Sequence, residues 1–278
     1  MLPIILYTLT CFLLGSMSWA LRWGPQSQLL VLLMGLAVFP LQRFVHKAPI
    51  KELGFRRCTT GQMARGILLP LLILGFVAAA DLLIGAAQLL PLTELRNPFI
   101  GTAVSTIWDL VWFLALNGAL LFLLEFVTEE LIFRGYILGK LTALGEMKGL
   151  ALASALFGFW HLPIAIWGVG PDPVRTPLYI MNMMLLGTVL GLLFLESRSL
   201  IPVAAFHALW NSIEYNLFGF MDQRALLVGS SRVVFDPEEG FLGTLALALV
   251  VAFLLARRSR FRPIVSEHPA MTPAEGFN

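Results

Sequence analysis

The chain has 278 residues, of which 58% are hydrophobic and 13% charged, and its mean hydropathy is +0.82. A soluble domain carries about 25% charged residues, so the composition excludes a soluble globular protein. It predicts an all-α, polytopic transmembrane helical bundle in contact with membrane lipid. The formal net charge of +2 gives no basic surface for a nucleic acid, and no nucleic-acid partner is expected.

Apolar runs predict about eight membrane spans of roughly 20 residues each. The first run has no basic residue before it, unlike a secretory signal, and it is therefore predicted to be a retained span. Together the spans form a single transmembrane domain, 1–256, with a catalytic core at about 105–220 and a polar cytoplasmic tail at 257–278. The predicted spans are 2–21, 28–45, 66–90, 106–128, 149–168, 177–197, 200–220 and 241–256.

Basic residues are unevenly shared between the two sets of alternate loops. One set, with the C-terminal tail, holds fourteen Lys and Arg residues, and the opposite set holds five. The positive-inside rule therefore predicts that both termini are cytoplasmic. The larger set is Arg43, Lys47, Lys51, Arg56, Arg57, Arg65, Arg134, Lys140, Lys148, Arg198, Arg257, Arg258, Arg260 and Arg262.

Four ionisable residues lie within ten residues at the end of the fourth predicted span, where the sequence EFVTEELIFRG holds Glu125, Glu129, Glu130 and Arg134. On an α-helix Arg134 lies about 40° from Glu130 but about 140° from Glu129. A Glu four residues before an Arg is also the favourable order for an ion pair. We therefore expect Glu130 to pair with Arg134, and Glu129 to point into a cavity that Glu125 could also line. The alternative is that both glutamates lie solvated at the cytoplasmic interface.

Two further clusters place histidines on helix faces. In FGFWHLP, Phe157 and His161 are four residues apart and share a face. In HALWN, His207 and Asn211 have the same spacing, and Glu214 falls within about 20° of His207 and could line the same cavity. A single histidine of this kind is more often a hydrogen-bonded core residue, so the prediction of a site depends on the combination.

The depth of these groups predicts the course of the fourth helix. At 1.5 Å per residue, the two histidines and Asn211 lie roughly 10–20 Å from the cytoplasmic ends of their spans. Glu129 reaches this depth only if its helix continues through the charged residues to about Lys140. We predict that it does, with the extra length taken up by tilt or by a break near Asn117-Gly118. All the groups then share one layer near the cytoplasmic side.

The assembled set would contain one carboxylate, two imidazoles and one carboxamide. A carboxylate and a neighbouring histidine can activate a water, and a second histidine and an asparagine can donate hydrogen bonds to an oxyanion. This chemistry predicts hydrolysis of an acyl bond by water without a cofactor. Glutamate and histidine are also zinc ligands, so a divalent metal is the alternative. The sequence has no H-E-x-x-H motif, and no metal site is expected.

The three clusters, in this order, resemble the CAAX-protease and bacteriocin-processing (CPBP) family of intramembrane glutamic endopeptidases, which includes the type II CAAX prenyl endopeptidases. The family pattern is a glutamate pair with an arginine four residues beyond, then F-x-x-x-H, then H-x-x-x-N or H-x-x-x-D. All three motifs are intact, and the resemblance covers about residues 125–214. It implies an all-helical bundle with a cavity open towards the cytoplasm or the lipid.

The resemblance also implies roles for individual residues. Glu129 would be the catalytic base that activates water with His161, and His207 and Asn211 would form the oxyanion hole. The supporting residues would be Glu130, Arg134 and Phe157.

The substrate implied by the resemblance is a membrane-anchored protein or peptide, as in relatives that trim three residues after a prenylated cysteine. The expected location is a bacterial inner (plasma) membrane. The alternative is a non-catalytic scaffold or bacteriocin-immunity protein that retains the fold, because a non-catalytic subunit of γ-secretase shares the resemblance. A transporter is the third alternative, but the sequence lacks the internal repeats that many transporters have.

Overall fold

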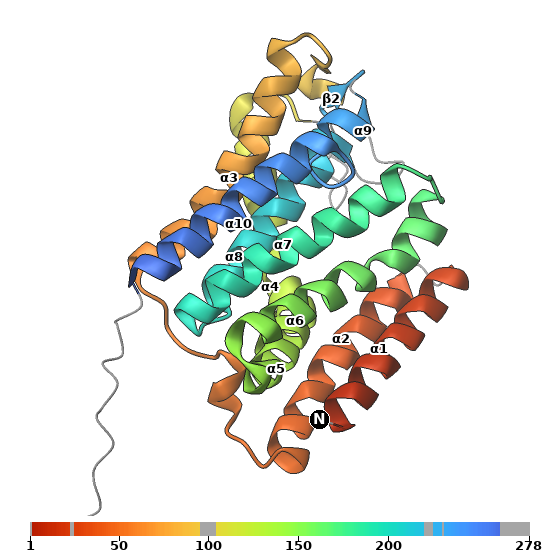
Figure 1. Ribbon diagram of the computed structural model, residues 1–278. Helices are drawn as coiled ribbons and strands as arrows, with labels where there is room; N and C mark the ends of the chain where they lie inside the picture. Colours follow the sequence, from red (N-terminus) through yellow and green to blue (C-terminus); the bar gives the residue numbers. More distant parts are fainter. Residues whose placement is uncertain (1, 23–24, 95–103, 220–224, 230, 262–278) are drawn as a thin grey trace, which may run out of the picture.

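The computed structural model describes residues 2–22, 25–94, 104–219, 225–229 and 231–261. These residues form an all-α bundle, with one two-residue strand pair (Figure 1). Seven of its helical segments are long and apolar enough to cross a membrane. This bears out the predicted fold class. The seven segments are Leu2–Ala20, Gln26–Val45, Thr60–Leu83, Ile107–Leu144, Glu146–Gly168, Arg175–Ser197 and Phe241–Arg258.

The first two helices lie side by side along one flank of the bundle (Figure 1). They are α1 (Leu2–Ala20) and α2 (Pro25–Pro40), and α2 continues as a π-helix, η1 (Leu41–Val45). The 3₁₀-helix η2 (Ile50–Leu53) then leads towards the third span.

The third helix, α3 (Thr60–Leu83), begins six residues before the predicted span and ends before residue 90. Its start is fixed by a capping box, in which Thr59 and Gln62 satisfy each other's backbone N–H groups. After α3 the chain forms β1 (Gln88–Leu89) and the 3₁₀-helix η3 (Leu92–Glu94), where the apolar run had suggested more helix.

The fourth helix is the longest of the described helices. It comprises α4 (Ile107–Glu125), the π-helix η4 (Phe126–Leu138), α5 (Gly139–Leu141) and the 3₁₀-helix η5 (Thr142–Leu144). The predicted continuation through the charged residues is confirmed. The suggested break near Asn117-Gly118 is wrong, because α4 is unbroken there and the change in helix geometry comes at Phe126 instead.

The next two helices pack against each other along much of their length. They are α6 (Glu146–Trp160), followed by the π-helix η6 (Ile164–Val169), and α7 (Arg175–Ser197). His161 is the C-terminal cap of α6, and Pro163 separates it from η6. Proline lacks a backbone N–H, which explains why the α-helix ends there.

The predicted span 200–220 is helical over residues 201–219 and is buried inside the bundle. It comprises α8 (Ile201–Glu214) and the π-helix η7 (Tyr215–Gly219), and α8 packs against both α3 and α4. It is not among the seven apolar segments, and its α-helix carries the polar residues His207, Asn211, Ser212 and Glu214. Most of its residues are buried, so it belongs to the core of the bundle.

The last part of the chain returns to the bundle before its final helix. β2 (Leu227–Val228) pairs antiparallel with β1, α9 (Arg232–Phe235) follows, and α10 (Phe241–Phe261) runs beside α7 and α3 (Figure 1). α10 therefore extends beyond the predicted end at residue 256, into the predicted tail. Residues 262–278 of that tail lie outside the described part of the chain.

The long fourth helix is held in place by close contacts that only glycine allows. A Cβ atom on Gly35 of α2 would clash with the carbonyl oxygen of Val127 in η4 and would crowd the backbone of Thr128. Gly66 of α3 meets the carbonyl oxygen of Pro202 in α8 in the same way. These contacts fix η4 and α8 against their neighbours.

Gly35→Ala should therefore lower the thermal stability of the purified protein in detergent. The added methyl group has to displace backbone, and overpacking of this kind costs about 1–3 kcal/mol. Gly75→Ala is the matched control, because Gly75 lies in α3 and no atom comes within 4 Å of its would-be Cβ. Alanine is the better helix former, so this control should be neutral or stabilising. Equal melting temperatures for the two variants would contradict the contact.

Candidate active site

Glu129, Glu130 and Arg134 lie on the π-helix η4, and Glu125 is the last residue of α4. The N–H of Gly139 donates to the carbonyl oxygen of Arg134, five residues earlier, as π-geometry requires. A π-turn holds more residues than an α-turn, so residues five apart come closer in rotation than the 140° expected for Glu129 and Arg134. π-Helical segments are rare, usually single turns, and frequently lie at functional sites.

The predicted ion pair is present in the core of the bundle. Arg134 Nη1 donates to Glu130 Oε1 over 2.8 Å, and the side chains are 2% and 0% exposed. The same oxygen lies 2.6 Å from His207 Nδ1. Glu129 forms no ion pair with any described residue. The expected division between a paired Glu130 and an unpaired Glu129 is therefore seen, although it does not arise from α-helical angles.

Phe157 of α6 is the packing surface shared by these groups. The guanidinium carbon of Arg134 lies 4.0 Å from the centre of its ring, a cation–π contact. The rings of His161 and His207 lie 4.7 and 6.0 Å from it, centre to centre. Phe157 thus separates the buried arginine from the space in front of the two histidines.

A cavity of about 320 Å³ lies in front of these residues. Glu129, His161, His207 and Asn211 all line it, so the structure brings the four predicted residues together. Glu125 lines it as well, as the sequence had suggested. The cavity wall also contains Trp160, Tyr179, Tyr215 and Glu238, and apolar side chains that include Leu121, Leu124, Ile164 and Met183.

The position of the cavity differs from the predicted layer near the cytoplasmic side. Its wall includes Ser18 and Trp19 near the end of α1, and Ser27 and Gln28 near the start of α2. These are the helix ends opposite the loops that carry most of the Lys and Arg residues. The prediction measured the depth of each residue from the basic loop of its own span. It did not foresee that the cavity extends from these residues towards the opposite ends of the helices.

The hydrogen bond of His161 fixes which of its nitrogens can act in the cavity. Its Nδ1 lies 2.8 Å from the carbonyl oxygen of Phe157, which can only accept, so Nδ1 carries a proton. In a neutral ring Nε2 is then an acceptor. Glu129 offers a second acceptor, because its Oε2 is buried without a hydrogen-bond partner among the described residues. Its Oε1 accepts a long bond of 3.4 Å from Trp160 Nε1.

Two other carboxylates hold the groups on the facing side of the cavity. Glu125 Oε1 accepts a 3.0 Å hydrogen bond from Asn211 Nδ2, and Glu130 holds His207 through Nδ1. Asn211 therefore keeps its second amide hydrogen, and His207 keeps Nε2, for contact with a bound molecule. The sequence left the role of Glu125 open, and the structure assigns it this contact.

Glu214 does not line this cavity, which corrects the sequence prediction. It shares a stripe with His207 but lies two turns further along α8, about 10 Å away. Tyr215, four residues after Asn211, takes the position at the cavity wall instead. Glu214 is buried elsewhere, with one carboxylate oxygen that has no hydrogen-bond partner among the described residues.

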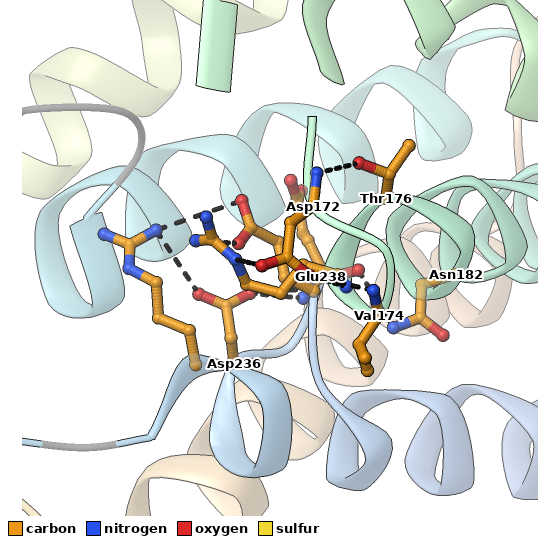
Figure 2. A network of polar contacts seen from close by, with 9 residues as sticks. Asp172, Val174, Thr176, Asn182, Asp236 and Glu238 are labelled. Atoms are coloured by element: carbon orange, nitrogen blue, oxygen red, sulfur yellow. Dashed lines mark hydrogen bonds and ion pairs between the residues drawn. The ribbon is translucent and has the colours of Figure 1, made fainter. Parts of the chain in front are cut away.

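A loop that the sequence prediction overlooked supplies Glu238 to the cavity. Asp236 accepts hydrogen bonds from the backbone N–H groups of Glu238 and Glu239, each over 2.8 Å. Asn182 of α7 donates to the carbonyl oxygen of Glu238 (Figure 2). Arg175, also of α7, pairs with Glu239 over 3.1 Å. The signal in the sequence was DPEEG, three acidic residues directly before an apolar span.

Three ligating groups in the cavity are close enough to hold a cation. Single ligand atoms of Glu125, Glu129 and His207 lie within 4.8 Å of one another. Two of these residues already have partners, since Glu125 accepts from Asn211 and His207 Nδ1 faces Glu130. Fewer of their ligand atoms are therefore available to a cation than the number of residues suggests.

Burial raises the pKa values of two carboxyl groups in the loop that carries Glu238. Burial and the neighbouring carboxylates Asp236 and Glu239 raise the pKa of Glu238 to about 8. Burial, followed by the charge of Glu239, raises the pKa of Asp236 to about 6. Asp172 has a pKa below its usual range, because the backbone N–H groups of Arg175 and Val174 stabilise its carboxylate.

The folded protein should lose stability as the pH rises towards 8. The folded state holds a proton on Glu238 up to about pH 8, whereas the unfolded chain releases it near 4.5. Between these values the free energy of unfolding falls by about 1.4 kcal/mol per pH unit for one such group. Thermal unfolding of Glu238→Gln in detergent should show a shallower decrease between pH 6 and 8.

Asp172→Asn is the control for this measurement. The pKa of Asp172 is lowered, so its contribution is complete at neutral pH and is lost only in acid. Its unfolding curve should run parallel to that of the wild type over the same pH range. Identical slopes for Glu238→Gln and wild type would contradict the raised pKa.

Comparison with known proteins agrees with the motifs. Residues 107–213 match the family model described as Type II CAAX prenyl endopeptidase Rce1-like. This segment runs from α4 into α8 and contains all four predicted catalytic residues. No curated protein and no solved structure matches the chain. The protein is an integral membrane protein, and the match over residues 107–213 supports its assignment to the CPBP family, with the Rce1-like type II CAAX prenyl endopeptidases.

Proposed function

We propose that this protein is an intramembrane glutamic endopeptidase that cleaves a membrane-associated, CAAX-type protein or peptide. The observation that carries the proposal is the arrangement of the cavity. Two hydrogen-bond acceptors, on Glu129 and His161, and two donors, on His207 and Asn211, line the same enclosed space. Peptide hydrolysis by water needs both kinds of group.

Glu129 and His161 are suited to hold and activate a water. A water molecule has two hydrogens, and Glu129 Oε2 and His161 Nε2 can each accept one of them. A water held in this way presents a lone pair to the substrate carbonyl carbon. As the oxygen attacks, its proton passes to Glu129 or His161, and the same group then returns it to the leaving amine. The cycle needs no covalent acyl-enzyme and no cofactor.

His207 and Asn211 are suited to stabilise the oxyanion that the attack creates. Asn211 has one amide hydrogen left after its bond to Glu125. A protonated His207 would donate from Nδ1 to Glu130 and from Nε2 to the oxyanion. Each such donor typically contributes about 10²–10³ in rate. Glu125 and Glu130 position these donors.

The substrate proposed here is a membrane-anchored protein or peptide, with a prenylated CAAX-type C-terminus as one form suggested by the family match. The apolar wall of the cavity suits a substrate that arrives from the lipid. We propose a bacterial inner membrane as the location, from the compact loops between the helices.

Glu129→Gln should abolish cleavage of a membrane-anchored reporter peptide in proteoliposomes, with a loss of about 10²–10⁴ in rate. Glutamine keeps the shape but cannot take the proton. His161→Ala should lose activity to a similar extent, because the second acceptor for the water is removed. Glu52→Gln is the control, as it makes the same change at an exposed residue.

Folding of each variant is checked by its melting temperature and its insertion into liposomes. If Glu129→Gln and His161→Ala are folded but cleave as fast as wild type, the protease assignment of this cavity is wrong. If these variants cleave no reporter but still give the wild-type phenotype in cells, the alternative of a non-catalytic scaffold or immunity protein is favoured instead.

Cleavage by the wild type should be unchanged after treatment with EDTA or 1,10-phenanthroline. The proposed water is held by Glu129 and His161, and the nearby groups of Glu125 and His207 are engaged with protein partners. Loss of activity that Zn²⁺ restores would show that the cluster of Glu125, Glu129 and His207 holds a catalytic metal.

A further inference from the structure

One end of the bundle, called here the basic end, gathers the arginines of several helices. Glu146 at the start of α6 and Glu196 near the end of α7 pair there with arginines from α3, α10 and the turn after α7. The loop between α2 and α3 lies at the same end, since the hydroxyl of Ser199 donates to the carbonyl oxygen of Arg56. The positive-inside rule places this end on the cytoplasmic side. The paired arginines are Arg65, Arg198, Arg257 and Arg258.

The second end of the bundle carries the β1–β2 pair and α9 (Figure 1). Three tryptophans are exposed near this end: Trp108 and Trp112 in the first two turns of α4, and Trp167 in η6. Tryptophan is enriched where a membrane meets water, because its ring is apolar and its N–H is polar. These side chains therefore indicate where the second membrane interface crosses the bundle, on the side opposite the arginines.

The cavity lies towards this second end. α1 contributes Ser18 and Trp19 from its last turn to the wall, and α2 contributes Ser27 and Gln28 from its first turn. α6 contributes only its last residue, Trp160. Gln28 is exposed and Trp19 is partly exposed, so the cavity comes to the surface beside them. Among the described residues, none from the loops of the basic end lines it.

The side of the cavity that faces the basic end is closed by the last part of η4. Every residue from Glu130 to Leu138 is buried. The ring of Phe133 packs on that of Phe157, 5.1 Å away from centre to centre. Gly135 lies so close to the carbonyl oxygen of Leu53 in η2 that a Cβ atom would clash with it. A substrate that came from the basic end would have to open this packed layer to reach the catalytic groups.

We propose that the cavity opens on the extracytoplasmic side, and that its substrate is a peptide segment presented from the extracytoplasmic leaflet. The inference rests on the proposed function, because it takes the cavity to be a peptidase site. A CAAX-type substrate meets this requirement when its lipid anchor lies in that leaflet. Of the two openings that the family resemblance implies, towards the cytoplasm or towards the lipid, the proposal excludes the first.

Cysteine labelling from each side of the membrane tests the orientation without any need for turnover. The native cysteines suit this test, since Cys11 is buried and Cys58 is partly exposed in the loop before α3. Gln28→Cys and Ser105→Cys, each combined with Cys58→Ser, place a thiol at the mouth of the cavity and at the exposed turn before α4. A membrane-impermeant maleimide is added to spheroplasts, which present the outer side, or to inverted vesicles, which present the inner side.

Cys58 of the wild type should react only in inverted vesicles, and the thiols of Gln28→Cys and Ser105→Cys only in spheroplasts. Cys58→Ser alone is the control and should stay unlabelled from both sides, because Cys11 is buried. Reaction of Gln28→Cys in inverted vesicles would overturn the proposal. So would a Gln28→Cys thiol that stays unlabelled in spheroplasts in which Ser105→Cys reacts, because the cavity would then have no opening on that side.

Two reporters test the side from which the substrate comes. Both carry the same peptide segment, joined to the extracytoplasmic end of a single membrane helix in one and to its cytoplasmic end in the other. Cells with the wild type should cleave the first and leave the second intact, and Glu129→Gln should cleave neither. Cleavage of the cytoplasmic reporter would overturn the proposal. If neither reporter is cleaved, the protease assignment fails, and the labelling pattern still decides on which side the cavity opens.

Discussion

The structure depends on the buried ion pair between Glu130 and Arg134. Two charges with almost no exposure are costly unless they are paired and hydrogen-bonded, and the loss of one partner typically costs about 3–5 kcal/mol. Here the pair is shared with His207 and covered by Phe157. Three helical segments, η4, α6 and α8, therefore meet at one charged point. The position of both histidines relative to Glu129 follows from that contact.

The site has two layers with different tasks. Glu125, which lines the cavity, and Glu130, which lies behind it, fix Asn211 and His207, respectively. Glu129 and His161, which also line the cavity, each keep an acceptor without a hydrogen-bond partner among the described residues. Placing four ionisable residues in an apolar helix is thus consistent with separate uses, although Glu125 and Glu130 both lie within ion-pair distance of His207 Nδ1, at 3.9 and 2.6 Å.

Much of this arrangement could be predicted from residue spacing. The pairing of Glu130 with Arg134, the passage of the helix through the charges and the meeting of three distant clusters all follow from local patterns. The π-geometry of η4 could not be predicted, because the same residues fit an α-helical pattern equally well. Glu238 was missed because a loop has no periodicity that would point to a buried position. Glu214 was misplaced because a shared stripe says nothing about where along the helix a cavity ends.

Because η4 is a π-helix, the geometry of the site depends on how many residues this segment contains. Each π-turn holds more residues than an α-turn, so η4 spends extra residues on the same length of helix axis. Removing a single residue between Phe126 and Glu129 would let that turn relax to α-geometry and would rotate everything before it relative to Arg134. Glu125 would then leave Asn211, while Glu130 would keep its arginine. The number of residues in this segment, and not their identity alone, therefore determines whether the two layers of the site face each other.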